Sequence, residues 1–124
     1  MFVRDSDGTP FGSFEQLAGQ LAKTDEALIC ATNAGIYGKD LRPIGLYIED
    51  HRVLRHLNTR RGGIGNFYLQ PNGVFSIGQQ GASIDATDEF AADLDAKLKS
   101  SRYATQSRPL LITKGKINLL IARG

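Results

Sequence analysis

The stretch TNAGIYGKDLRPIGLYIED, residues 32–50, joins a polar turn to the alternating pattern of a β-strand and is the main indication of the fold. It follows ALICA, residues 27–31, a short apolar run of the length of a buried strand. Asn33 and Gly35 end that run, and both residue types tolerate the left-handed backbone of tight turns. The pattern predicts either a plain turn or a site at this strand end, and composition leaves both open.

Strand patterns account for much of the remaining chain. Residues 44–49 and 52–54 form a predicted hairpin that turns at Asp50 and His51. The triplet Pro-Asn-Gly at 71–73 predicts a second hairpin between residues 66–70 and 74–77. Further strands are expected at residues 82–85, 103–107, 109–113 and 116–121, with a turn at 114–115. Of these, the apolar run at 109–113 is expected to be buried.

Two segments have the periodicity of amphipathic helices. In the first, Ser13 is placed as the N-cap and Gln16 completes a capping box. Its apolar side chains recur at helical spacing and share one face: Phe14, Leu17, Ala18 and Leu21. The second helix begins at Thr87 or Asp88. Its predicted apolar face consists of Phe90, Ala91, Leu94 and Leu98.

Composition is typical of a single globular domain that spans residues 1–124. The 124 residues include 14 Gly and 4 Pro, which favours many tight turns and a β-rich fold. A formal net charge of +2 is too small to indicate nucleic acid as a partner. The densest basic cluster consists of Arg52, Arg55, His56, Arg60 and Arg61, which is more typical of a solvated loop. Nucleic-acid binding is therefore only the weaker alternative.

No cofactor or metal is expected. The two histidines lack patterned carboxylates, and the calcium-like start at Asp5 and Asp7 lacks its later ligands. The single cysteine, Cys30, lies in an apolar run and is expected to be a small buried hydrophobe. Neither a signal peptide nor a stretch of about 18 apolar residues is visible, so the sequence predicts no membrane association. As written, the chain is expected to stay in the cytoplasm.

Several blocks together resemble one family. They are FGSF at 11–14, ATNAG at 31–35, RPIGLYIED at 42–50, GNFYLQPNGVF at 65–75 and ATQSRPLLI at 104–112. In this order they resemble the phosphodiester glycosidase family, and especially bacterial relatives of the hydrolase that removes N-acetylglucosamine to uncover mannose 6-phosphate. The resemblance implies an α+β fold, with antiparallel curved sheets, about two helices packed on one side, and a site at strand ends.

The resemblance covers only the N-terminal portion of such a domain. Family members are longer, and their later part adds an Arg-containing strand and an Asp-Gly-Gly-Gly-Ser type motif to the pocket. The family usually has Gly where this chain has Arg108. The resemblance therefore leaves open whether the chain hydrolyses a sugar 1-phosphodiester or only binds it. A non-catalytic carbohydrate-binding or assembly module is the alternative.

The chemistry of a sugar phosphodiester indicates candidate binding residues. Asn33 is placed to hydrogen-bond a sugar hydroxyl, beside Gly35, and Arg42 to pair with the phosphate as a planar fork. Further polar contacts are expected from Asn66, Gln106 and Ser107. The nearest carboxylates are Asp40, Glu49 and Asp50, and none is assigned a catalytic role. Free strand edges in residues 110–112 and 116–121 predict a homodimer or larger assembly.

Overall fold

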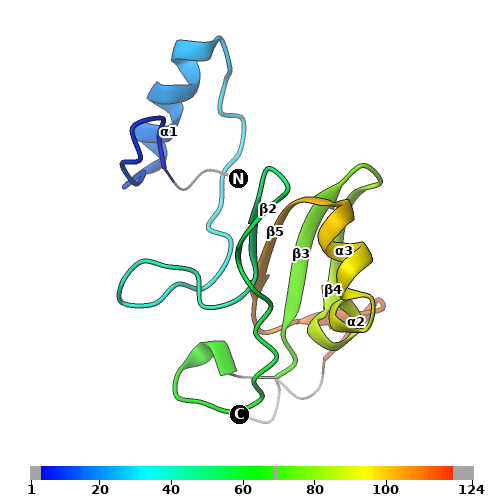
Figure 1. The fold of residues 1–124 in the computed structure, drawn as a ribbon. Coiled ribbons are helices and arrows are strands. Elements are labelled where there is room, and N and C mark those ends of the chain that lie inside the picture. Colours follow the sequence, from blue (N-terminus) through cyan, green and yellow to red (C-terminus); the bar gives the residue numbers. More distant parts are fainter. Residues whose placement is uncertain (1–3, 69, 119–124) are drawn as a thin grey trace. The chain divides into compact units, whose positions relative to one another are not determined.

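A computed structural model of the chain describes residues 4–68 and 70–118 (Figure 1). The chain divides into two compact units, Met1–Asn33 and Ala34–Gly124. The described residues form three α-helices, a five-stranded antiparallel sheet and a two-stranded sheet. The predicted α+β class is confirmed.

The first unit is built on helix α1, Phe14–Leu21, which continues into the 3-10 helix η1, Ala22–Thr24. The Ser13 hydroxyl caps α1 by accepting from the Gln16 N–H at 3.3 Å, as predicted. The Gln16 side chain reaches one residue further back than a capping box requires and accepts from the Gly12 N–H at 2.7 Å. Leu17 and Leu21 are buried on one face, so the helix and its apolar side are confirmed.

The predicted strand at residues 27–31 is wrong. These residues have no strand structure, Ile29 is 96% exposed, and Cys30 is exposed rather than buried. An apolar run becomes a strand only when another strand supplies its hydrogen bonds. Among the described residues, no strand pairs with this segment.

The second unit contains the main sheet, in the strand order β2-β1-β5-β3-β4. Its strands are β1 Tyr47–Glu49, β2 Arg52–Arg55, β3 Gly73–Gly78, β4 Gly81–Ala86 and β5 Ser101–Ser107. The predicted β1–β2 hairpin is confirmed. Its two turn residues have positive φ values, 45° at Asp50 and 64° at His51, which suits the right-handed twist of the flanking strands.

The second predicted hairpin is wrong, because its first strand is absent. Residues Asn66–Tyr68 form the 3-10 helix η2, and β3 pairs instead with β4 and β5. The carbonyl of Pro71 accepts from the Leu110 N–H at 2.8 Å, and that of Asn72 accepts from the Thr87 N–H at 3.0 Å. The Pro-Asn-Gly triplet therefore makes long-range bonds in place of a local turn.

Helices α2, Thr87–Ala92, and α3, Leu94–Ser100, pack on one side of the sheet (Figure 1). The predicted single helix is interrupted at Asp93, whose φ of −128° and ψ of 46° are not helical. Phe90 is fully buried in the core cluster, which also contains Leu46, Ile48, Val74 and Ala104, with Leu94 and Leu98 against it. The predicted apolar face is correct, although the helix is not continuous.

The last described strands are β6, Ile112–Thr113, and β7, Lys116–Ile117. They form a hairpin that turns at Lys114 and Gly115 with φ values of 52° and 75°, so this predicted turn is confirmed. The strand is shorter than predicted and is not buried, since Ile112 is 62% exposed. Residues 119–121 of the last predicted strand lie outside the described part of the chain.

Replacing Phe90 by Ala tests whether the helix-covered face supplies the main core. We expect Phe90→Ala to lower the free energy of unfolding by about 3–5 kcal/mol, because a fully buried ring leaves a cavity. Urea denaturation measures this change. Phe75→Ala is the matched control, because that ring lies on β3 but is 37% exposed. An equal loss in both variants would contradict the assignment of the core to one face.

Candidate functional site

The side chain of Gln106, near the end of β5, ties three segments of the second unit together. Its Oε1 accepts from the backbone N–H groups of Leu46 at 3.1 Å and Asn58 at 3.0 Å. Its Nε2 donates to the Asn58 carbonyl at 2.8 Å and to the Thr87 hydroxyl at 3.2 Å. A primary amide has two donor hydrogens and two acceptor sites, so all its capacity is used. Gln106 is 1% exposed and acts as a buried clamp.

Two glycines let neighbouring segments approach this clamp. A Cβ on Gly45 would lie only 2.8 Å from the ring of Phe67 and from Cβ of Gln106. A Cβ on Gly35 would collide with the hydroxyl of Thr105. Segments from four separate parts of the sequence therefore meet at one end of the sheet. All four belong to the blocks that carry the family resemblance.

The guanidinium of Arg108 lies over two aromatic rings at this end of the sheet. Its Cζ is 5.0 Å from the ring centre of Phe67 and 5.8 Å from that of Tyr68. The two rings contact each other edge to face at 5.5 Å. Burial lowers the pKa of Arg108, but an arginine stays charged at neutral pH. The arrangement holds a cation against aromatic faces in a partly dry setting.

Asn72 adds a second polar group to the same region. It is 4% exposed, and its carbonyl is bonded to the Thr87 N–H next to the Gln106 clamp. Within residues 4–68 and 70–118, its side-chain Nδ2 has no hydrogen-bond partner. A buried amide donor without a partner is costly, so water or a ligand would stabilise it.

The other predicted binding residues are spread more widely. Gly35 and Ser107 lie beside Thr105 and Gln106, whereas Asn33 is exposed and belongs to the other unit. Arg42 is exposed on a loop closed by the bridge between Tyr37 and Pro43. Asn66 lies in η2, but its side chain is outside what the structure describes. The structure thus brings together Gly35, Gln106 and Ser107.

The candidate carboxylates are engaged elsewhere. Asp40 accepts from the Arg42 N–H at 3.2 Å, and Asp50 pairs with Arg102 at 2.9 Å. Glu49 accepts from the Tyr47 hydroxyl at 3.1 Å. Burial raises the pKa of Tyr47, and the charge of Glu49 adds to the effect. Among the described contacts, none joins these three carboxylates to the Gln106 clamp.

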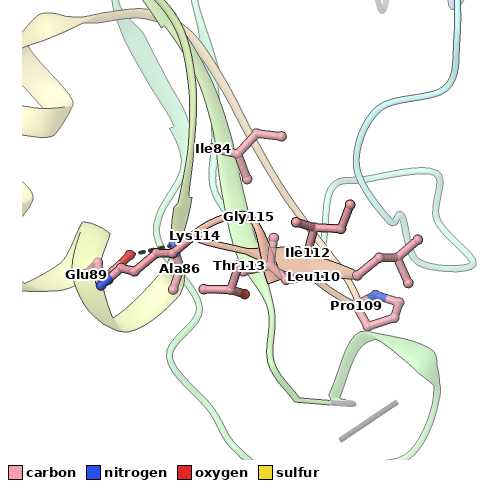
Figure 2. Close-up of a pocket in the computed structure, with 10 residues that line it drawn as sticks. Ile84, Ala86, Glu89, Pro109, Leu110, Ile112, Thr113, Lys114 and Gly115 are labelled. Carbon is pink, nitrogen blue, oxygen red and sulfur yellow. Dashed lines mark hydrogen bonds and ion pairs between the residues drawn. The ribbon is translucent and has the colours of Figure 1, made fainter. Parts of the chain in front are cut away.

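A hollow of about 520 Å³ is lined in part by the residues that follow Arg108 in the sequence (Figure 2). It is lined by β4, by Glu89 and by residues 109–115, which are mostly apolar. Figure 2 shows Lys114 reaching across to Glu89, and the Nζ–Oε1 distance is 2.8 Å. This ion pair holds the tip of the β6–β7 hairpin to α2.

The described part of the chain contains no group of three or more His, Cys, Asp or Glu side chains arranged to hold a metal ion. None of its helices has the length and apolar character needed to cross a membrane.

Sequence reasoning missed Asn58 and Thr87 as partners of the clamp. Asn58 sits in a polar loop that gives no sign of contacting a residue 48 positions away. Thr87 was placed only as a possible helix cap. Arg108 is not among the predicted binding residues, and its only sequence signal is that the resembling family usually has Gly at this position.

The chain is similar in sequence to a curated protein from a bacterium. The uncharacterized protein YigE of Escherichia coli strain K12 is 31% identical over 118 residues. The alignment covers 95% of this chain but only 44% of that protein, so the chain spans less than half of the relative's length. No family model matches the chain. No solved structure matches it significantly.

Replacing Gln106 by Leu tests the clamp. We expect Gln106→Leu to lower the free energy of unfolding by about 3 kcal/mol or more. It leaves several buried polar groups without hydrogen-bond partners, and each such group costs about 1–3 kcal/mol. Urea denaturation measures the loss. Ser107→Ala is the matched neighbouring control and is expected to change stability by less than about 1 kcal/mol. A Gln106→Leu variant as stable as Ser107→Ala would contradict the clamp.

The Lys114–Glu89 pair predicts a pH range for docking of the hairpin tip. The hydrogen bond from Lys114 lowers the pKa of Glu89. The stabilisation that ionised Glu89 gives to hairpin docking is therefore complete above the ordinary carboxyl pKa of about 4.3. It is lost as the pH falls through the lowered pKa. The same bond raises the pKa of Lys114. The stabilisation that protonated Lys114 gives to docking is therefore complete below the ordinary lysine pKa of about 10.4 and is lost as the pH rises through the raised pKa.

The NMR chemical shifts of the Lys114 side chain, followed as a function of pH, measure the pH range over which the hairpin tip stays docked. We expect Glu89→Gln to abolish the shift change at acidic pH. The control Lys116→Gln, on the same hairpin, leaves that change intact. An unchanged acid transition in Glu89→Gln would show that another group causes it.

Proposed function

We propose that the chain is a domain of the phosphodiester glycosidase type that binds a sugar 1-phosphodiester at the Gln106 end of the sheet. The observation that carries this proposal is the convergence of sequence blocks. Blocks around Gly35, Gly45, Phe67 and Gln106 are separated in sequence and meet in one place. Convergence is expected if the resemblance reflects a shared site, since residues of a site must come together while matching residues on unrelated surfaces need not.

The chemistry of this region suits such a ligand. Arg108 supplies a cation with several donors, which matches the oxygens of a phosphodiester. Tyr68, half-buried beside it, supplies an aromatic surface of the kind that packs against apolar faces of small ligands. Gln106 has no free hydrogen-bonding capacity, so in this proposal it shapes the site and does not contact the sugar.

Binding has more support than hydrolysis. Hydrolysis of a glycosidic bond usually needs a pair of carboxyl groups on either side of it. The carboxylates Asp40, Glu49 and Asp50 have their own partners away from the clamp. We therefore assign no catalytic residue, and glycosidase activity remains a proposal that rests on the resemblance alone.

Calorimetric titration with the methyl phosphodiester of N-acetylglucosamine 1-phosphate tests the binding proposal. We expect Arg108→Leu to weaken binding about tenfold or more, because a charge-assisted hydrogen bond contributes about 1.5–3 kcal/mol. Arg102→Leu is the matched control, because Arg102 lies near the start of β5, whereas Arg108 directly follows its end, and Arg102 pairs with Asp50. The Arg102→Leu variant should bind the diester with the same affinity as the unmodified chain.

Two results would contradict the proposal. One is an unmodified chain that shows no heat of binding to the diester, and the other is an equal loss of affinity in both arginine variants. Release of free N-acetylglucosamine during the titration would instead replace binding by hydrolysis as the function.

As a second proposal, we infer that the chain self-associates as a homodimer through a free strand edge. The outermost strands of the five-stranded sheet are β2 and β4, and neither has an outer neighbour among residues 4–68 and 70–118. Exposed apolar residues lie on both, with Leu54 at 51% and Ile84 at 66% exposed.

Nucleic-acid binding has less support, because Arg61 of the basic cluster pairs with Asp88 at 2.8 Å.

A further inference from the structure

We propose that β4 is the edge at which two copies of this chain pair, antiparallel and about a two-fold axis at Ile84, to form one continuous sheet. This inference rests on the self-association proposed above and names the edge and the register. The occupant of the edge is β4 of a second copy.

The backbone groups on the outer side of β4 are determined by its hairpin with β3. Gly78 and Gly81 flank a two-residue turn and form a pair, so they are a hydrogen-bonded pair. Hydrogen-bonded and non-hydrogen-bonded pairs alternate in an antiparallel ladder. The N–H and C=O groups of Ala82, Ile84 and Ala86 therefore point away from β3, toward the free edge.

Only one of these outward groups has a partner within the described residues. The Ala86 N–H donates to Glu89 Oε2 at 3.4 Å, a long bond. Glu89 is held more closely by Lys114, at 2.8 Å. Pairing at Ala86 would exchange this N–H bond to Glu89 for a bond to the partner subunit. The other five outward groups have no partner within the described residues.

A two-fold axis at Ile84 matches these groups to one another. In that register Ile84 lies opposite Ile84 of the partner subunit, and Ala82 lies opposite Ala86 of the partner subunit. All three outward residues then face outward residues, which gives six backbone hydrogen bonds. A shift of one residue would place outward groups against groups already bonded within each sheet.

Charge favours β4 over β2 as the paired edge. The carboxylate of Asp85 is neutralised within its own chain by Lys97 at 2.9 Å, and the register places Asp85 opposite Ser83 of the partner subunit. In contrast, β2 carries Arg52 and Arg55 within four residues. Two copies of β2 would gather four guanidinium groups along a short interface, and like charges on a strand edge oppose pairing.

The apolar side of the interface is Ile84. This side chain is 66% exposed and borders the hollow of about 520 Å³ between β4 and the β6–β7 hairpin (Figure 2). Pairing at the axis brings the two Ile84 side chains together on the same face of the joined sheet. Each then covers apolar surface that is exposed in the single chain.

Disulfide cross-linking tests the register. The exposed Cys30 is first replaced by Ser, and Ile84→Cys and Ala82→Cys are made in that background. Opposite residues of a hydrogen-bonded pair lie about 5.5 Å apart at Cα, within the range of a disulfide. The two Ala82 positions would be about 14 Å apart, because four residues separate them along the strand. With copper phenanthroline and air as oxidant, we expect Ile84→Cys to give mostly covalent dimer and Ala82→Cys little.

Sedimentation separates failure of the edge from failure of self-association. We expect the unmodified chain to sediment as a dimer and Ile84→Lys to raise the dimer dissociation constant at least tenfold. Val53→Lys, on β2, is expected to leave it unchanged, and urea denaturation confirms that both variants are folded. A monomeric unmodified chain would overturn self-association together with this inference. A dimer that resists Ile84→Lys but is lost in Val53→Lys, or equal cross-linking at 82 and 84, would overturn the assignment to β4 alone.

Discussion

The four hydrogen bonds of the Gln106 amide are the constraint on which the second unit depends. They bind the segment that leads into β1, the loop at Asn58 and the start of α2 to the end of β5. Each of these elements is short, and β1 has only three residues. A short strand gains little from its own ladder, so a buried side chain with every group satisfied adds order that the ladder alone does not provide. The Gln106 side chain also leaves no room for a side chain at Gly45, and the hydroxyl of the neighbouring Thr105 leaves none at Gly35.

The two faces of the sheet also differ in how far they are buried. On one face Phe90 packs with Ile48, Val74 and Ala104 in the buried core. On the other face Thr105 is buried beside Gly35, whereas Phe75 and Ile84 remain substantially exposed. Hydrophobic burial is thus concentrated under α2 and α3, and the outer strand β4 contributes little to it. A strand that its own chain leaves partly uncovered is the natural place for contact with another chain.

Local patterns predicted what local chemistry decides. Ser13 caps α1, Asp50 and His51 turn the first hairpin, and Phe90 marks the buried helix face, because each depends on neighbours in sequence. The failures share a cause in tertiary structure. Residues 71–73 have the composition of a hairpin turn, but bonds to Leu110 and Thr87 determine their path. The role of Asn58 in the candidate site was equally hidden, since its partner lies 48 residues away.

The position of Arg108 bears on the proposed ligand. At a position where the phosphodiester glycosidases that the sequence resembles usually have Gly, this chain places a guanidinium over Phe67 and Tyr68. A bulky cation fills space that a glycine leaves for close approach of backbone to ligand. It also adds a fixed positive charge in a partly buried region, where charge acts more strongly than in water. An anionic phosphodiester would gain from that charge, whereas a neutral sugar would only lose the space. If the proposed site binds a sugar 1-phosphodiester, Arg108 would therefore act on the phosphate and not on the sugar.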